Sequence, residues 1–403
     1  MNRYNLIHLY PKNREEIGEI FARFGEGEAE RENLLQKGQF FFLFVQDLPW
    51  KAAIKLKEEF RSCGGEVLLE NKGEDSLSPH TNALLMGRNG EYMELVQKLK
   101  NQPFGLKRLS VEVMELLQKE KEYGRILEMP LPHGASPLII GEKTLIMGIL
   151  NVTPDSFSDG GRYNTLEKAI AHAEELVEAG ADIIDVGGES TRPGYEKVAE
   201  EEELKRVIPV IEELSKRISL PISIDTYKAA VAKKAIEAGA HIINDVWGAK
   251  GDPHMPVVVA ESKAPVILMH NRKARNYRDL IPDMLNDLRV SIDLILAAGG
   301  KEEQIIIDPG IGFAKDYEEN LTVMHHLREF SSLGYPILLG TSRKSMIGKT
   351  LDLPVEERIE GTIATVVYGI EQGAEIVRVH DVKEVARAVR MTDAMVRRGW
   401  RHG

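Results

Sequence analysis

The sequence is poor in cysteine and aromatic residues, and it contains no long hydrophobic run. Cys63 is the only cysteine among 403 residues, so no disulfide can form within the chain, as is usual in a reducing cytoplasm. No apolar run approaches the roughly 18 residues that a membrane span needs, and the N-terminus has no signal-peptide pattern. We therefore expect a cytoplasmic protein in which Cys63 is a core residue at a helix end and not a nucleophile.

Positive charge is also in short supply. The chain has 52 Lys and Arg against 63 Asp and Glu, a formal net charge of −11. This excess of negative charge argues against nucleic acid or an anionic membrane as a partner and leaves small molecules as the expected ligands. The remaining composition, 43% hydrophobic and 29% charged, is that of a folded protein, and the length favours two domains.

From Thr144 onward, short apolar runs alternate with amphipathic helical stretches. In Thr165–Ala179, for example, Leu166, Ile170 and Val177 recur at helical spacing. Four such stretches end near a glycine, which lets the chain turn back into the next strand. The apolar runs are Thr144–Val152, Asp182–Gly188, Pro221–Thr226, His241–Val246, Pro265–His270, Ile305–Gly310, Pro336–Ser342 and Ile376–Asp381. Eight strand–helix units predict an α/β fold of the (β/α)8 TIM-barrel type, which is favoured over a doubly wound open sheet.

A smaller domain of residues 1–130 is expected ahead of the barrel. Its predicted strands are Gln39–Gln46, Gly65–Leu69 and Ala83–Gly87, and its predicted helices are Leu48–Cys63, Glu91–Asn101 and Lys107–Lys121. This pattern indicates a small α/β domain. It contains no glycine-rich phosphate loop and no cluster of metal ligands, so the sequence does not indicate its role.

The junction between the two domains is rich in proline. Glu128–Ser136 is interpreted as a linker because three prolines and a glycine lie in and around it. The catalytic domain is then residues 137–403. Leu138–Met147 is interpreted as a hairpin with Gly141 in its turn, which would close the bottom of the barrel.

Polar residues follow every one of the eight predicted strands. In order, the strand ends carry Asn151, Gly187–Gly194, Asp225–Thr226, Asn244–Asp245, Met269–His270, Asp308–Phe313, Ser342–Ser345 and Arg378–Asp381. Each of these residues also has a purely structural interpretation when it is considered alone. Asp308 would begin an ordinary turn, Asp381 would cap a helix, and His270 would be a buried histidine with its hydrogen bonds satisfied inside the barrel. Because barrel enzymes build their active sites at the C-terminal strand ends, eight polar ends together predict an active site. A loop broken by Pro154 and Gly160 follows the first strand and would lie over it.

The residue types indicate the ligand. Asp225, Asp308 and Asn244 offer mainly acceptors, which suit a flat heterocycle that presents parallel N–H donors. Arg378 and His380 alternate on the last strand and both face the lumen, at the usual phosphate corner of this fold. The expected substrate is therefore a flat nitrogen heterocycle that bears a phosphate ester, with Mg2+ near Asn151.

The strand ends also carry motifs that closely resemble those of the dihydropteroate synthases of folate biosynthesis. The motifs are Asn151–Gly161, Gly188–Gly194, Ser223–Thr226, Ile243–Asp245, Asp308–Phe313, Ser342–Ser345 and Arg378–His380. The resemblance spans about residues 137–403 and leaves residues 1–130 outside. It implies a transferase that condenses 6-hydroxymethyl-7,8-dihydropterin diphosphate with 4-aminobenzoate, giving 7,8-dihydropteroate and pyrophosphate. It further implies Mg2+ as cofactor, a homodimer and a target of sulfonamides.

The resemblance also implies roles for individual residues. The pterin diphosphate would contact Thr191, Asp225, Asn244, Met269, Asp308, Phe313, Lys344, Arg378, Val379 and His380, with Val246 as a further apolar wall. The 4-aminobenzoate would contact Phe157, Thr191, Arg192, Pro193 and Ser345. Asn151 would ligate Mg2+, and Lys344, Arg378, His380 and Asp159 would be catalytic. Phe157 and Asp159 belong to the first loop, which would close over the reacting methylene.

The chemistry fits a dissociative substitution. No residue of the motifs looks like a covalent nucleophile, and an arylamine is unprotonated at neutral pH, so no strong base is needed. The site must stabilise the departing pyrophosphate, through Mg2+, Arg378 and His380, and keep water from the cation left behind.

Two other readings stay open. A corrinoid-linked methyltetrahydrofolate methyltransferase uses a similar pterin-binding barrel but needs neither two long loops nor an anion corner. A pterin-binding regulatory protein without catalysis would have no need of Asn151, Lys344 and Arg378 together.

Overall fold

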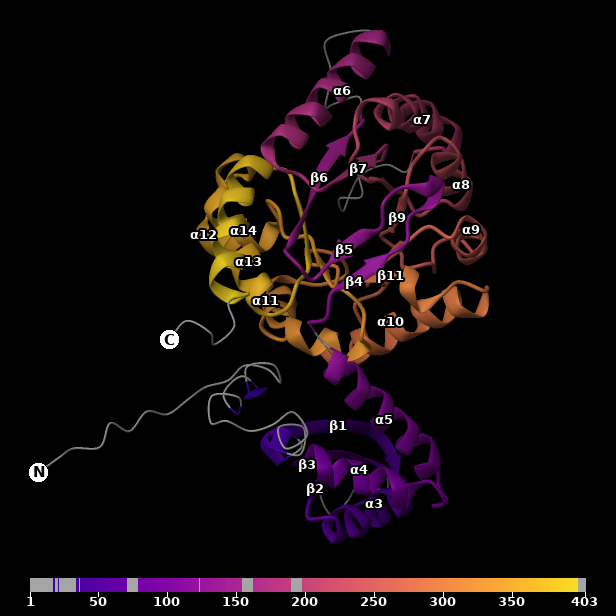
Figure 1. The fold of residues 1–403 in the computed structure, drawn as a ribbon, viewed down its shortest axis with the longest axis vertical. Helices are drawn as coiled ribbons and strands as arrows, with labels where there is room; N and C mark the ends of the chain where they lie inside the picture. The colour runs from indigo at the N-terminus through magenta and orange to yellow at the C-terminus, as the bar shows by residue number, and fades with distance from the viewer. Residues whose placement is uncertain are drawn as a thin grey trace, which may run out of the picture. The chain divides into compact units, whose positions relative to one another are not determined.

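The computed structural model describes residues 17–18, 21, 34–35, 37–70, 79–122, 124–153, 162–189 and 198–397. The chain divides into two compact units, one of residues 1–123 with 398–403 and one of residues 124–397 (Figure 1). The first is a small α/β unit and the second is a barrel, so the predicted fold class is confirmed.

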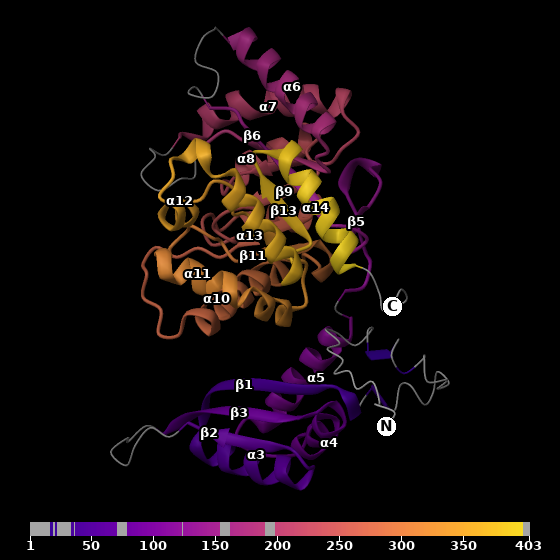
Figure 2. The same ribbon diagram turned by 90° about the vertical axis from the view of Figure 1, so that its left-hand side faces the viewer.

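The N-terminal unit is built on a three-stranded antiparallel sheet in which β3 lies between β1 and β2 (Figure 2). Its elements are β1 (Phe40–Pro49), α3 (Trp50–Ser62), β2 (Glu66–Leu69), β3 (His80–Arg88), α4 (Asn89–Leu99) and α5 (Leu106–Glu122). Alternate strand residues such as Leu43 and Leu85 pack with Leu56 and Phe60 of α3 in one core. The strand β1 runs past its predicted end because its register shifts between Val45 and Leu48, so α3 begins two residues later than expected.

The second unit is a barrel of eight parallel strands surrounded by helices (Figure 1). The strands are β6 (Leu145–Asn151), β7 (Ile183–Gly187), β8 (Ile222–Asp225), β9 (Ile242–Asp245), β10 (Val266–Met269), β11 (Ile305–Asp308), β12 (Leu338–Leu339) and β13 (Ile376–Val379). Neighbours in the chain are neighbours in the sheet, and β13 pairs with β6. A parallel bridge between Ile307 and Ile337 closes the barrel between β11 and β12.

Helices on the outside connect the strands. They are α6 (Arg162–Ala179), α7 (Glu200–Arg217), α8 (Ala229–Glu237), α9 (Met255–Ser262), α10 (Leu280–Ala297), α11 (Tyr317–His325), α12 (Ser345–Leu351), α13 (Ile359–Glu371) and α14 (Val382–Val396), with 3-10 turns at Glu302–Gln304, Leu327–Leu333 and Val355–Glu357. The glycines predicted to end four helices, Gly180, Gly239, Gly299 and Gly373, all have φ near +100°, where a side chain is strained. Among the described residues, no helix is both long and apolar enough to cross a membrane.

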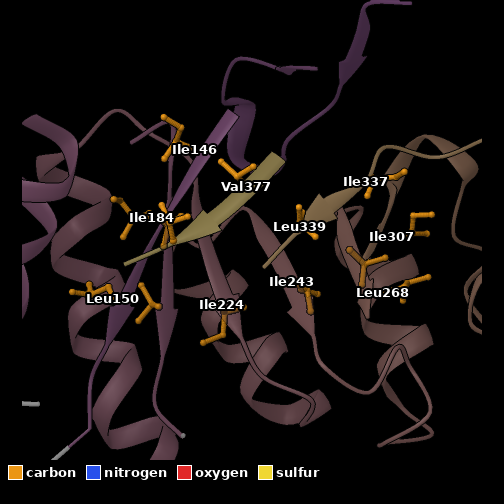
Figure 3. Close-up of a cluster of buried hydrophobic side chains, with 14 of the residues drawn as sticks. Ile146, Leu150, Ile184, Ile224, Ile243, Leu268, Ile307, Ile337, Leu339 and Val377 are labelled. Atoms are coloured by element: carbon orange, nitrogen blue, oxygen red, sulfur yellow. The ribbon is translucent and has the colours of Figure 1, made fainter. Parts of the chain in front are cut away.

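Strand residues alternate between the helix layer and the barrel interior. Outward residues such as Ile184, Ile224 and Ile243 form one large core with the surrounding helices (Figure 3). Inward residues near the strand starts form a second, smaller core inside the barrel, made of Leu145, Met147, Ile183, Ile242, Ile267, Ile306, Leu338 and Ile376. This period of two leaves the inward positions at the strand ends for other side chains.

The bottom of the barrel is closed differently from the prediction. Leu138–Met147 is not a hairpin: β5 (Leu138–Ile140) pairs antiparallel with β4 (Leu127–Met129), and β6 belongs to the barrel. Met129, Leu138 and Ile140 are buried against the inner core. The segment 128–136 is therefore not a free linker. It contains the last two residues of β4 and a 3-10 turn (Pro132–Gly134), and Nε2 of His133 lies 2.9 Å from the carbonyl oxygen of Ile236.

We expect Asp393→Ala to destabilise the barrel without changing its chemistry. The Asp393 carboxylate on α14 accepts hydrogen bonds from the backbone N–H (2.8 Å) and hydroxyl (2.7 Å) of buried Thr144, which precedes β6. Losing both acceptors should cost about 1–3 kcal/mol. Thermal unfolding should show a lower Tm with kcat unchanged, because this end of the barrel serves stability. A large loss of kcat at a temperature where the variant is folded would contradict this.

Candidate active site

The inward strand positions turn from apolar to polar along each strand. Ile183 is followed two residues later by Asp185 on β7, and Ile376 is followed by Arg378 on β13. The inward side chains at the strand ends are Asn151, Asp225, Asn244, Met269, Asp308 and Arg378, and Asp185 and Ser223 lie on the same inner face two residues before the ends of β7 and β8. Parallel strands bring their C-terminal ends to one face, so residues that are up to 227 positions apart in the chain meet there.

Arg378 stands at the centre of a buried hydrogen-bonded group. Its Nε donates to Asp185 Oδ2 at 2.6 Å, and its Nη2 donates to Asp225 Oδ2 at 2.7 Å. Asn244 Nδ2 donates to the same Asp185 oxygen at 3.1 Å. Ser223 pairs with Asp185 across the sheet. We call Asp185, Ser223, Asp225, Asn244 and Arg378 the inner polar cluster.

Three oxygen atoms of the inner polar cluster are buried without a hydrogen-bond partner among the described residues. They are Asp185 Oδ1, Asp225 Oδ1 and Ser223 Oγ. A buried acceptor without a donor costs about 1–3 kcal/mol, so such groups are rare in folded proteins and point to a bound partner. A ligand that inserts N–H groups into the barrel would satisfy them.

The charges of the cluster are unevenly balanced. Burial raises the pKa of Asp225 to about 7. The guanidinium of Arg378 lowers this pKa, and the negative charge of Asp185 raises it further. Burial lowers the pKa of Arg378. The negative charges of Asp185 and Asp225 outweigh this effect and hold the pKa of Arg378 above its ordinary value. One guanidinium therefore faces two carboxylates, and the cluster as a whole attracts donors and cationic groups.

Asp308 lies beside this cluster at the start of a tight turn, Asp308–Phe313, which we call the 308–313 turn. Its Oδ1 accepts from the N–H of Gly310 at 2.7 Å. Burial raises the pKa of Asp308, while the Gly310 N–H and the ammonium of Lys344 oppose this. The Lys344 Nζ lies 4.3 Å from the centre of the Phe313 ring, so the turn combines an acceptor, a cation and an aromatic wall.

His380 and Ser342 form the corner between β12 and β13. Ser342 Oγ lies 3.0 Å from His380 Nδ1 and accepts from the backbone N–H of His380 at 3.2 Å. Arg343 forms a two-point ion pair with Asp381 next to them, with Nε 2.9 Å from Oδ2. Both loops of this corner are thus held together at their first residues.

The other predicted site residues are placed as follows. Asn151 ends β6, and its Oδ1 and the Asp225 side chain both lie 3.7 Å from the position that a Cβ on Gly187 would take. Met269 is buried inside the barrel end, whereas Ser345 is exposed at the start of α12. Val379 faces outward into the helix core, so its side chain is turned away from the other site residues. Phe157, Asp159, Thr191, Arg192 and Pro193 lie outside the described residues.

This geometry has counterparts in known proteins. The family model described as pterin binding enzyme matches residues 147–380. A dihydropteroate synthase from Bacillus subtilis is 62% identical over 267 residues, which are 66% of this chain and 94% of that protein. The chain belongs to the dihydropteroate synthase family.

Solved structures of dihydropteroate synthases agree with this assignment. One from Clostridium difficile, determined with pteroic acid, is 54% identical and has a TM-score of 0.63, covering 64% of this chain and 99% of that one. One from Xanthomonas albilineans in complex with 7,8-dihydropteroate is 40% identical with a TM-score of 0.61, covering 66% of this chain and 98% of that one. The predicted family and its transferase function, synthesis of dihydropteroate, are therefore confirmed.

Sequence reasoning did not single out three charged groups near the carboxyl ends of the strands. Asp185 lies inside a strand and was overlooked because only the strand ends were considered, although its spacing from Gly187 places both on the inner face. Lys315 follows the 308–313 turn and is buried. Lys228, after β8, forms ion pairs with Glu189 and with buried Glu203. Glu189 is the last described residue before the second loop, so Lys228 fixes the point at which that loop begins.

We expect a truncated protein that starts at Gly124 to fold and retain synthase activity. It keeps β4, every described residue of the site and residues 147–380, which the family model matches, and 64% of this chain is enough to cover 99% of the Clostridium difficile synthase. Soluble yield, thermal unfolding and turnover would be compared with the full chain.

The matched control starts at Leu131. It removes β4 and with it buried Met129, so it should expose the bottom of the barrel and lose stability by about 2–5 kcal/mol. A folded Gly124 truncate without activity would show instead that the N-terminal unit is needed for catalysis.

Proposed function

We propose that the inner polar cluster and the 308–313 turn bind the pterin ring of 6-hydroxymethyl-7,8-dihydropterin diphosphate. The proposal is supported by the buried oxygens of Asp185, Ser223 and Asp225 that have no hydrogen-bond partner in the part of the chain that the structure describes. The pyrimidine edge of a pterin presents an amino group and a ring N–H side by side, which suits paired carboxylate acceptors. Asn244, Asp308 and Lys344 would complete the polar contacts, with Met269 and Phe313 as apolar walls.

Arg378 is assigned to the ring site more readily than to the diphosphate. Its Nε and Nη2 already donate to Asp185 and Asp225, so its charge is largely matched inside the barrel. We propose that it orients these two carboxylates toward the pterin. His380, paired with Ser342, then remains the described candidate for the diphosphate, with Asp159 as a further catalytic candidate on the first loop.

Asn151 is the proposed protein ligand of the metal ion. Its side-chain oxygen lies 3.7 Å from the position that a Cβ on Gly187 would take, and among the described residues no group of three acidic or histidine side chains could hold a metal ion. Such a site fits Mg2+, which accepts one or two protein oxygens and takes its other ligands from phosphate and water. When bound, Mg2+ would neutralise charge on the departing pyrophosphate.

The reaction that fits these residues is a dissociative substitution at the pterin methylene. The C–O bond to the diphosphate breaks first, and the amino group of 4-aminobenzoate then adds to the methylene and loses a proton. Asp225 and Asp308 would stabilise the cationic pterin. Phe157, Thr191, Arg192, Pro193 and Ser345 remain the proposed contacts of 4-aminobenzoate, from loops that would exclude water.

The family membership also supports a homodimer in the cytoplasm and inhibition by sulfonamides, which mimic 4-aminobenzoate. Light scattering of the purified chain would test the dimer, and competition between a sulfonamide and 4-aminobenzoate would test the inhibition.

The direct test of the proposed function is pyrophosphate release. The purified chain, given both substrates and Mg2+, should release pyrophosphate and form 7,8-dihydropteroate in equal amounts. Methyl transfer from a methylated pterin without pyrophosphate release would favour the methyltransferase. Tight pterin binding without either reaction would favour the regulatory protein.

A further inference from the structure

A chain of three buried or half-buried side chains lies behind the 308–313 turn. Asp287 of α10 holds His270, with Oδ2 3.0 Å from Nε2. His270, fully buried after β10, lies with its Nδ1 3.2 Å from the Nζ of Lys315. Lys315 precedes α11 and donates to the carbonyl oxygens of Gly310 and Phe313, each at 2.9 Å. None of these three side chains has a role in the proposed function.

The protonation states follow from the contacts. Arg272 pairs with Asp287, and although burial raises the pKa of Asp287, its hydrogen bonds with His270 and Arg272 lower it overall, so the carboxylate only accepts. His270 Nε2 must then carry the proton. Burial lowers the pKa of His270 to about 4, so the ring is neutral and its Nδ1 is an acceptor. Lys315 thus faces three acceptors, which only an ammonium can satisfy.

Burial itself acts against this charge. It lowers the pKa of Lys315 to about 7, while the nearby carboxylate of Asp308 favours the charged form. The three hydrogen bonds leave no proton of the ammonium unpaired, as a buried cation requires. The three acceptors around its Nζ therefore favour the ammonium form of Lys315, beside Asp308 and behind its turn, against the effect of burial.

The 308–313 turn depends on such support. Gly310 and Gly312 have φ of 67° and 86°, and Ala314 has φ of 49°, all in the left-handed region. A Cβ on Gly310 would lie 2.2 Å from the carbonyl oxygen of His270, so the turn crosses closely over the end of β10. Lys315 holds the carbonyl groups of Gly310 and Phe313. The N–H of Gly310 donates to Asp308, and the ring of Phe313 lies next to the Lys344 ammonium.

We infer that Lys315 is a positioning residue of the synthase: its ammonium holds the 308–313 turn in shape and keeps the Asp308 carboxylate charged for the pterin. The inference rests on the proposed function, because it assumes that Asp308 accepts hydrogen bonds from the ring. Lys315 itself makes no contact with substrate.

The positive charge of Lys315 affects the pKa of Asp308 in one direction. The charged groups that face Asp308 are Lys315 of its own loop, Lys344 after β12 and Arg378 of β13, with Asp185 and Asp225 beyond Arg378. Removing one cation raises the pKa of Asp308 further above its ordinary value. The ionised form of Asp308 is the form that binds the pterin ring, so pterin affinity is lost as pH falls through the pKa of Asp308. In a variant without the Lys315 charge, this loss should occur at a higher pH.

The test measures dihydropterin affinity by calorimetry across a pH series for Lys315→Met, Lys315→Gln and Tyr277→Phe in the full chain. Lys315→Gln removes the charge but retains donors for the two carbonyl groups, in case the methionine variant does not fold. Tyr277→Phe is the matched control, because Tyr277 Oη donates to the carbonyl oxygen of Ala314 at 3.0 Å and supports the same loop without a charge.

Both lysine variants should lose about tenfold in affinity at neutral pH, and the pH at which binding fails should rise by about one unit. Tyr277→Phe should leave that pH unchanged. Lysine variants that bind with unchanged pH dependence, or a tyrosine variant that shifts it equally, would overturn the inference. If the unaltered chain bound no dihydropterin at any pH, the proposed function would fail instead.

Discussion

Arg378→Ala should abolish most synthase turnover, weaken binding of the dihydropterin ring and destabilise the barrel together. The guanidinium is the shared partner of Asp185 and Asp225, whose carboxylates are otherwise buried. Breaking a buried pair by removing one partner costs about 3–5 kcal/mol, because uncompensated charge stays behind. We expect a loss of about 100-fold or more in kcat/KM and a clearly lower Tm.

The pH dependence of stability provides an independent check on Arg378→Ala. Without the guanidinium, the pKa of Asp225 moves further above the value of an unfolded chain. A carboxyl group with a raised folded-state pKa destabilises the protein above that pKa, so the variant should gain stability as pH falls from about 8 toward 5. Arg217→Ala, which removes only exposed ion pairs with Glu213 of α7 and Glu174 of α6, should change Tm little at any pH. If the variant lost turnover but bound the unphosphorylated pterin alcohol normally, the result would indicate that Arg378 binds the diphosphate and not the ring site.

Asp308→Asn should weaken pterin binding far more than 4-aminobenzoate binding. The amide can still accept from the Gly310 N–H through Oδ1, so the turn should keep its shape. Its NH2 group would face the N–H donors of the ring, and buried donors left unpaired cost about 1–3 kcal/mol. The expected result is a loss of about tenfold to 100-fold in dihydropterin affinity.

Calorimetry with a dihydropterin and the KM for 4-aminobenzoate separate these outcomes. The KM for 4-aminobenzoate should change by less than about threefold, because Asp308 lies inside the barrel and Ser345 lies outside on α12. Equal losses for both substrates would mean that the 308–313 turn had been distorted, and unchanged pterin affinity would remove Asp308 from the site.

Much of the barrel and its site could be predicted from the sequence because one physical rule governs both. Each strand alternates between the helix layer and the interior, and parallel strands end on one face. Asp225, Asn244, Asp308 and Arg378 therefore had to meet once the eight strands were recognised, and the structure places them together.

What could not be predicted depends on pairing between distant segments. A turn glycine such as Gly141 does not determine which strand pairs with β5, and the partner proved to be β4. Likewise, the sequence indicates that Arg378 faces the lumen but not that Asp185, 193 residues earlier, is its closest partner. The chain from Asp287 through His270 to Lys315 joins three elements and follows no sequence period at all.

A crystal structure of the full chain with 6-hydroxymethyl-7,8-dihydropterin bound would test the proposed pterin site most directly. We expect the ring to lie inside the barrel, with its N–H groups within about 3.2 Å of Asp308 and of Asp185 Oδ1 or Asp225 Oδ1, which have no partner among the described residues. A pterin that binds elsewhere, or that lies in the barrel with these oxygens paired only to water, would contradict it.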